Sequence, residues 1–178
     1  MDAILKVKML EVSKIKEAII VAAFTLAAVY TPVMIHFFGG VNAGQKFLPM
    51  PFFVLLAGIL LGWRAGLVTA IAAPLISFLL SGMPAINILP FIILQLAVLG
   101  LVSGILRKKM DVFFSLCGAI FAGWLAIGIS LFLFSRIDAL NYVITGLKNG
   151  LIGIVLALVL ISTAVIIINK YLSREKGI

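Results

Sequence analysis

Long apolar runs separated by short polar breaks dominate the chain. The runs are continuous rather than alternating, so they predict helices and not the strands of a membrane barrel. A helix needs about 20 mostly apolar residues to cross a bilayer. Six such spans fit, at about residues 18–37, 47–61, 65–80, 88–106, 112–134 and 146–169. The pattern predicts an all-α integral membrane protein, a compact six-transmembrane-helix bundle that forms a single domain over residues 1–178.

The second and third of these spans are short and contain prolines. Pro49 and Pro51 remove backbone donors at the start of the second span, and Pro74 interrupts the third. Non-helical backbone at membrane depth is tolerated where it is buried in protein or lines a cavity. Short, proline-interrupted spans therefore point to a substrate site, although kinked helices that only pack would show the same pattern.

Composition supports the membrane assignment, because 64% of the residues are hydrophobic and only 11% are charged. Such a chain cannot cover a water-soluble domain with polar side chains. The net charge is +8, but the basic residues stand at the ends of the apolar runs. Lipid headgroups, rather than nucleic acid, are therefore the expected acidic partner. The single cysteine, Cys117, lies within an apolar run and is expected to be a small buried residue.

The distribution of lysine and arginine predicts the orientation. With a cytoplasmic N-terminus, eleven of these residues fall on the cytoplasmic side, and only Lys46, Arg136 and Lys148 fall on the other. The positive-inside rule then predicts an even number of spans with both termini in the cytoplasm. Residues 1–17 carry four lysines and are expected to lie as a basic segment on the membrane surface.

Several kinds of activity are disfavoured by the residues that the chain lacks. No carboxylate pair lies within the apolar spans, which disfavours an ion-coupled pump. No phosphate-binding GxxxxGK[ST] motif is present, so the chain is not expected to hydrolyse ATP. With His36 as the only histidine, no metal site is expected either. The sequence predicts neither an enzyme nor a cofactor.

Polar groups suited to ligand binding gather on the predicted outer side. The glycine-rich stretch 36–47 is expected to be an outer loop that gates the site. A few polar groups in an apolar pocket are enough to orient a small molecule. The candidate ligand-binding residues are His36, Asn42, Gln45 and Lys46 in this loop, Asn87 and Gln95 near the outer end of the fourth span, Trp124 in the fifth span, and Arg136, Asn141, Tyr142 and Asn149 before and at the start of the sixth.

Each candidate also has a purely structural interpretation. Lys46 and Arg136 have the character of interfacial anchors, and Trp124 could be packing bulk. Gln95 is an amide within an apolar span, so it either bridges helices or faces a cavity. Asn149 could serve as a hydrogen-bonding residue at a helix start. The sequence leaves these alternatives open.

Small residues recur along the first span. Ala18 and Ala22 are four residues apart, as are Ala23 and Ala27. This spacing places small side chains on one helix face and lets another helix approach closely. The first span is therefore a candidate docking surface for a partner subunit.

The ordered combination of these features resembles a known family. A basic N-terminal stretch precedes the AxxxA helix, and the run FLPMPFFVLLAGILLG over residues 47–62 is followed by Ala65-Gly66. The segment PLISFLLSGMP follows at residues 74–84, then Gln95-Leu-Ala, then GLVSG at 100–104 before Arg107-Lys-Lys. Over nearly its whole length the chain resembles the substrate-binding S components of energy-coupling factor (ECF) vitamin transporters.

The resemblance implies a mechanism. S components are six-helix bundles in the plasma membrane of prokaryotes that bind a vitamin or related micronutrient near the outer face. They work with a transmembrane coupling subunit and two cytoplasmic ATPase subunits, which would supply the hydrolysis that this chain lacks. The family docks through the AxxxA face, which corresponds to Ala18, Ala22, Ala23 and Ala27. The first outer loop gates the pocket, and the ligand moves inward when the whole bundle topples in the membrane.

The identity of the ligand does not follow from a shared fold. Three cations against one acid on the predicted outer side hint at a carboxylate or phosphate. Two other functions stay open at this stage. A structural or assembly protein would bind no ligand, and a stand-alone facilitator would transport without any ATPase partner.

Overall fold

The computed structural model describes the backbone of residues 13–47, 49–135 and 138–175. Side chains are described within these ranges except at residues 36–47 and 171–175. Six helices occur in the described residues, and no strand does: α1 (Lys14–Phe47), α2 (Pro49–Leu61), α3 (Trp63–Ser81), α4 (Leu89–Leu106), α5 (Val112–Phe134) and α6 (Ala139–Glu175). The prediction of an all-helical chain is confirmed for this part of the sequence.

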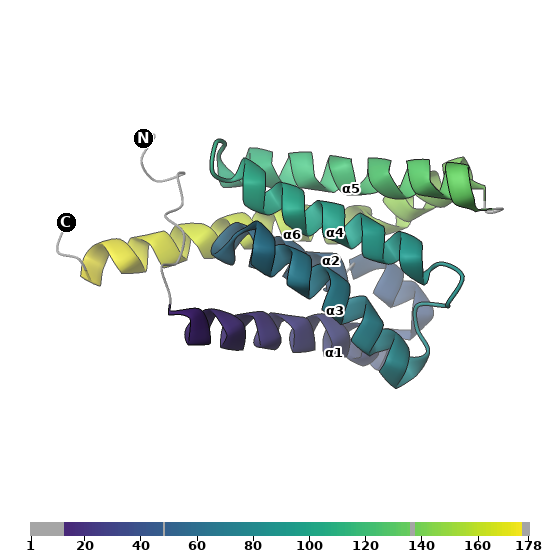
Figure 1. The fold of residues 1–178 in the computed structure, drawn as a ribbon, viewed down its shortest axis with the longest axis horizontal. Helices are drawn as coiled ribbons and strands as arrows, with labels where there is room; N and C mark the ends of the chain where they lie inside the picture. Colours follow the sequence, from purple (N-terminus) through teal and green to yellow (C-terminus); the bar gives the residue numbers. More distant parts are fainter. Residues whose placement is uncertain (1–12, 48, 136–137, 176–178) are drawn as a thin grey trace.

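The helices lie roughly along one long axis, and the start of α1 and the end of α6 lie at the same end of the bundle (Figure 1). Within the described ranges, five helices are long and apolar enough to cross a membrane, and α2, with 13 residues, is shorter. These are the features of a multi-pass membrane protein.

The first and last helices extend beyond the predicted spans. α1 continues as helix through residues 36–47, where the sequence predicted a glycine-rich loop. α6 begins at Ala139, so the stretch before Gly146 that was predicted to be a loop is also helical. Glycine and asparagine lower helix propensity by about 1 kcal/mol or less each, which neighbouring turns can override. Pro49 and Pro51 both lie in the first turn of α2, where a missing N–H costs little.

Helix α2 is the centre of the bundle. It contacts α1, α3 and α4, and its side chains Val54, Leu55 and Ile59 are at most 1% exposed. They belong to the main hydrophobic core together with Leu96 of α4 and Leu116 of α5. A helix that is buried on all sides carries no polar face. The short second span is therefore a core element enclosed by protein.

Glycines let α2, α3 and α4 approach closely at one end of the bundle. A Cβ atom built on Gly66 would lie 2.6 Å from the carbonyl oxygen of Gly100, and one on Gly100 would lie 2.6 Å from that of Gly66. The single residue between α2 and α3, Gly62, has a φ of 102°, which favours glycine. The glycines in the 62–66 and 100–104 motifs thus bring helix backbones together, as small residues commonly do in membranes.

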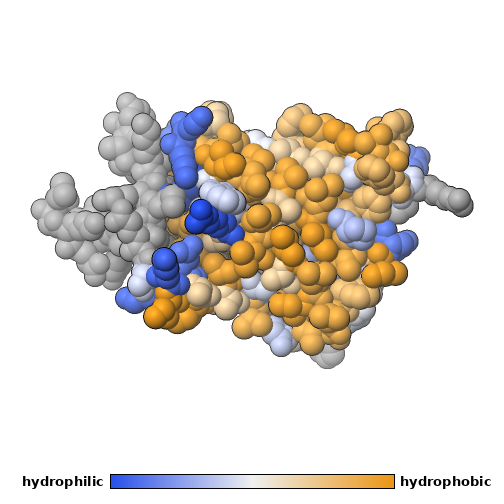
Figure 2. All heavy atoms as spheres, viewed as in Figure 1, coloured by the Kyte–Doolittle hydropathy of each residue, from blue (hydrophilic) through white to orange (hydrophobic). Residues whose placement is uncertain are grey.

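The surface separates into an apolar middle and polar ends. Figure 2 shows hydrophobic side chains over most of one face, with hydrophilic ones toward the two ends. Large side chains of α5 such as Phe132 and Phe134 are about 80% exposed, as expected for contact with lipid. The α1 start, the α2–α3 and α4–α5 links and the α6 end share one end of the bundle, hereafter the basic end (Figure 1). The described cations of the basic end are Lys14, Lys16, Arg64, Arg107, Lys108, Lys109 and Lys170.

Candidate functional site

A cavity of about 890 Å³ lies in the half of the bundle away from the basic end. It is bordered by the first turns of α2, the stretch 92–99 of α4, the link between α3 and α4, the middle of α5 and the N-terminal half of α6. α4 and α6 do not pack directly on one another in the described part of the chain, and the cavity separates them. Its size falls in the range of small-molecule sites, about 300–1,000 Å³.

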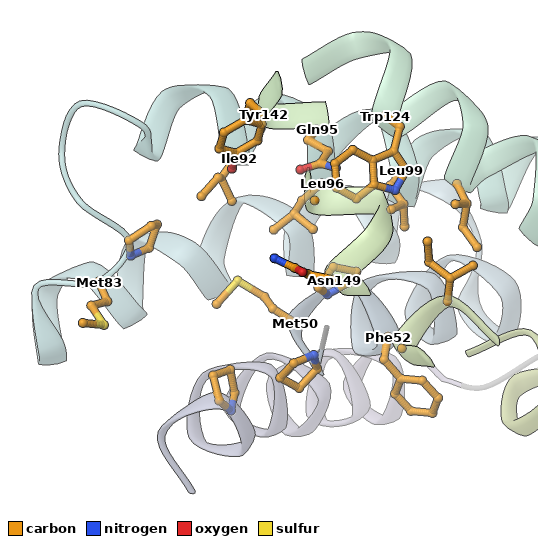
Figure 3. Close-up of a pocket in the computed structure, with 18 of the residues that line it drawn as sticks. Met50, Phe52, Met83, Ile92, Gln95, Leu96, Leu99, Trp124, Tyr142 and Asn149 are labelled. Atoms are coloured by element: carbon orange, nitrogen blue, oxygen red, sulfur yellow. The ribbon is translucent and has the colours of Figure 1, made fainter. Parts of the chain in front are cut away.

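Most of the cavity wall is apolar, with a few polar groups. Met50, Leu96 and Ile92 supply aliphatic and thioether surface (Figure 3). The polar side chains of the wall come from α3, α4 and α6, together with the residue before α6. They are Ser77, Gln95, Asp138, Asn141, Tyr142, Thr145 and Asn149. An apolar wall with a few orienting polar groups is typical of binding sites for small molecules.

Five of the eleven residues predicted to bind ligand line this one cavity. They are Gln95, Trp124, Asn141, Tyr142 and Asn149. They come from three helices, and the fold brings them together across more than fifty positions of sequence. Asn141 and Tyr142 do so from the first turn of α6 rather than from a loop. Their role in binding stays a prediction.

The other six predicted residues are not placed in the cavity wall. Asn87 is exposed in the turn before α4 and is not among the lining residues. The side chains of His36, Asn42, Gln45, Lys46 and Arg136 lie outside the described residues. Lys148, which contributed to the hint of an anionic ligand, is exposed on α6 and does not line the cavity.

Local hydrogen bonds fix the start of α6 at the cavity mouth. Oδ1 of Asp138 accepts a hydrogen bond from the backbone N–H of Asn141 at 3.1 Å, which satisfies one of the free donors of the first helical turn. The hydroxyl of Thr145 donates to Oδ1 of Asn141 at 3.3 Å, one turn further on. The Asp138 side chain therefore caps α6 at Ala139, before the predicted start of the sixth span at about residue 146. The loop before this helix is correspondingly shorter than predicted.

Two glycines lie beside Trp124, one next to it on α5 and one facing its ring from α6. Gly123 lies against α4, since a Cβ atom there would be 3.4 Å from the carbonyl oxygen of Gln95. Gly146 of α6 leaves space for the indole, because a Cβ atom there would lie 2.5 Å from Cη2 of Trp124. The ring is thus enclosed between α4 and α6 beside Gln95 (Figure 3).

Most of the apolar wall of the cavity was not predicted from the sequence. Pro49, Met50 and Pro51 line the cavity from α2, and Met83 and Pro84 do so from the α3–α4 link. The prolines of the Pro-Met-Pro motif were the available signal. They predicted that the second span borders a substrate site, but not that these three residues form its wall. An apolar residue that faces a cavity cannot be told from a core residue by its type alone.

The cavity wall offers mainly hydrogen-bonding groups set in apolar surface. The lining residues provide amides, hydroxyls, one carboxylate and an indole, and no group of three potential metal ligands occurs among the described residues. Amide and hydroxyl groups hold a ligand by hydrogen bonds, and each can act as donor and acceptor.

Compared with known proteins, the chain matches no family model, no curated protein and no solved structure.

Proposed function

We propose that this chain is the substrate-binding subunit of an ECF-type importer, which captures a vitamin or related micronutrient at the outer face of a prokaryotic plasma membrane. The observation that carries the proposal is the cavity of about 890 Å³, toward which three helices direct five polar or aromatic side chains that the sequence had singled out. A packing bundle without a ligand would gain nothing by keeping such a space open, because protein interiors are close-packed.

The charge distribution supports an orientation for the proposed importer. Seven described cations belong to the basic end, and the cavity lies in the other half of the bundle. By the positive-inside rule the basic end faces the cytoplasm, with six spans and both termini on that side. The cavity then faces the outside, where a nutrient would arrive.

The proposed energy source is external to the chain. A transmembrane coupling subunit and two cytoplasmic ATPases would provide hydrolysis and topple the bundle to release its ligand inward. Support comes from α1, where Ala18, Ala22 and Ala23 are exposed and Ala27 is half-buried. Three small exposed residues on one transmembrane helix provide a surface on which another helix can pack closely.

Identifying a co-purifying molecule tests the proposal directly. Mass spectrometry on the protein purified from its own host in mild detergent is expected to find a vitamin-like molecule at near one-to-one stoichiometry. The variant Ile154→Trp enlarges a half-buried side chain of the cavity wall and is expected to fill part of the cavity. It should lose that molecule while keeping the helical circular dichroism spectrum. If neither protein carries a molecule and no vitamin raises the melting temperature of the wild type, the proposal is wrong.

A further inference from the structure

The side chain of Gln95 is the most unusual polar group of the cavity. It lies within the apolar span Leu89–Leu106, is half-buried, and makes no hydrogen bond to any described residue. An amide in an apolar environment without a partner is unfavourable. Because Gln95 lines the cavity, its donor and acceptor are both available to a bound molecule. The two groups lie side by side in the plane of one amide.

Trp124 provides a flat surface next to this amide. Gly123 brings α5 against the backbone of Gln95, and Gly146 accommodates the six-membered ring of the indole. A Cβ atom on Gly146 would lie 2.5 Å from Cη2 and 2.8 Å from Cζ3 of that ring. Gly146 therefore determines how far the indole can withdraw from the cavity toward α6.

The remaining walls can enclose a flat ring. Met50 and Leu96 border the same cavity, and the Asn149 side chain points into the space that they border (Figure 3). Methionine adapts its shape and packs favourably on aromatic rings. A ligand ring that lies along the Trp124 indole would thus be surrounded by the apolar side chains of Met50 and Leu96, and the Gln95 amide would lie at its edge.

We propose that the cavity recognises a planar nitrogen heterocycle with a hydrogen-bond donor beside an acceptor on one edge, such as a lactam. Gln95 pairs with that edge, Trp124 stacks along the ring, and Gly146 positions Trp124. Side-chain amides pair in this bidentate way with heterocycle edges that offer one donor and one acceptor. Aromatic side chains stack on heterocyclic rings irrespective of the ring's identity. The inference rests on the proposed function, because it names the chemical class of the captured ligand.

Tryptophan fluorescence gives a direct readout. The chain has two tryptophans, and Trp63 lies near the basic end beside Arg64, whose Cζ is 5.3 Å from the indole centroid. In a Trp63→Phe protein freed of co-purified molecules, Trp124 is the only tryptophan, and selective excitation of tryptophan reports on it alone. The probes are 2-quinolone, N-methyl-2-quinolone, which lacks the donor, and decahydro-2-quinolone, which keeps the lactam but is not planar. Saturable quenching is expected with 2-quinolone, and affinities at least about tenfold lower with the other two.

Variants assign the discrimination to residues. Gln95→Leu keeps the approximate volume and should abolish the preference for 2-quinolone over its N-methyl derivative. Gly146→Ala displaces the indole and should weaken 2-quinolone binding at least about tenfold. Gly128→Ala is the matched control at the α5–α6 interface, because its Cβ atom would meet only Cγ2 of Val143, at 3.3 Å, away from the cavity wall. It should change the affinity less than about twofold.

The outcomes separate this inference from the proposed function. Equal affinity for all three probes, or no saturable quenching by 2-quinolone, would overturn the heterocycle proposal. A co-purifying molecule without a planar ring would overturn it too, while supporting nutrient capture. Preference for 2-quinolone that is unchanged in Gln95→Leu would overturn the assignment of Gln95. Absence of both a co-purified molecule and vitamin-induced stabilisation would instead remove the proposed function.

Discussion

Replacing Gly100 with alanine is expected to destabilise the bundle by about 3 kcal/mol, at the upper end of the usual range for overpacking. The added Cβ atom would lie 2.6 Å from the carbonyl oxygen of Gly66 and 2.7 Å from its carbonyl carbon. Both are backbone atoms of α3, so no side chain can rotate away to make room. The α3–α4 pair must separate along its length, which also disturbs the core around Val54.

Thermal unfolding in detergent, followed by circular dichroism, measures this effect. Gly118→Ala is the matched control, because its Cβ atom would meet only Cδ1 of Leu106, the end of a flexible side chain. The control should lower the melting temperature far less than Gly100→Ala does. Equal melting temperatures for the two variants would mean that the α3–α4 contact is looser than the structure indicates.

The middle helices were the most predictable part of the fold. The span predicted at 112–134 coincides with α5, and the span at 88–106 differs from α4 by one residue. Charged residues and an N-terminal proline bound these runs sharply, and such signals act locally. The C-terminal part of α1 and the first turns of α6 contain glycine, asparagine and lysine, and these residues predicted loops. Tertiary context and the Asp138 cap overrode that local preference.

Prediction of the candidate site was partial for a different reason. Gln95 and Trp124 could be singled out because an amide and an indole are conspicuous inside apolar spans. Asn141 and Tyr142 were found for the wrong reason, as loop residues, and reach the cavity from helix α6. Met50 was indicated only indirectly, by the Pro-Met-Pro motif, because its place in the cavity wall depends on how α2 sits between α1 and α4. Proximity across the bundle is not encoded in local spacing.

The glycines pack differently in the two halves of the bundle. Near the basic end, Gly66 and Gly100 bring backbones together and leave no room for a ligand. In the other half, Gly146 instead makes space for one large side chain, Trp124, at the edge of a cavity. The first arrangement gives a rigid packed base. The second places a large aromatic side chain at the cavity edge, and the proposed binding subunit, which moves as a unit, would use both arrangements.

Replacing both Ala22 and Ala23 with leucine is expected to reduce uptake of the co-purifying ligand by more than tenfold, with ligand affinity changed less than twofold. Both alanines are exposed on α1, whose other faces pack on α2, α3 and α6. Bulky side chains at positions where helices approach closely keep the partner helix at a distance. Neither residue lines the cavity, so binding should survive. Uptake is measured in cells that carry the coupling module, and affinity is measured on the purified protein.

Val68→Leu is the matched control, since it also enlarges an exposed side chain, on α3 at 54% exposure. It should leave uptake unchanged if the effect belongs to α1. Uptake that survives in the double variant contradicts the docking surface, and uptake that persists without any ATPase identifies a facilitator.

The single variants Ala22→Leu and Ala23→Leu then separate the two alanine pairs. Ala18 and Ala22 are both exposed, whereas Ala27 is half-buried against the bundle. A partner helix can therefore reach the whole of the first pair, and we expect Ala22→Leu to have the larger effect.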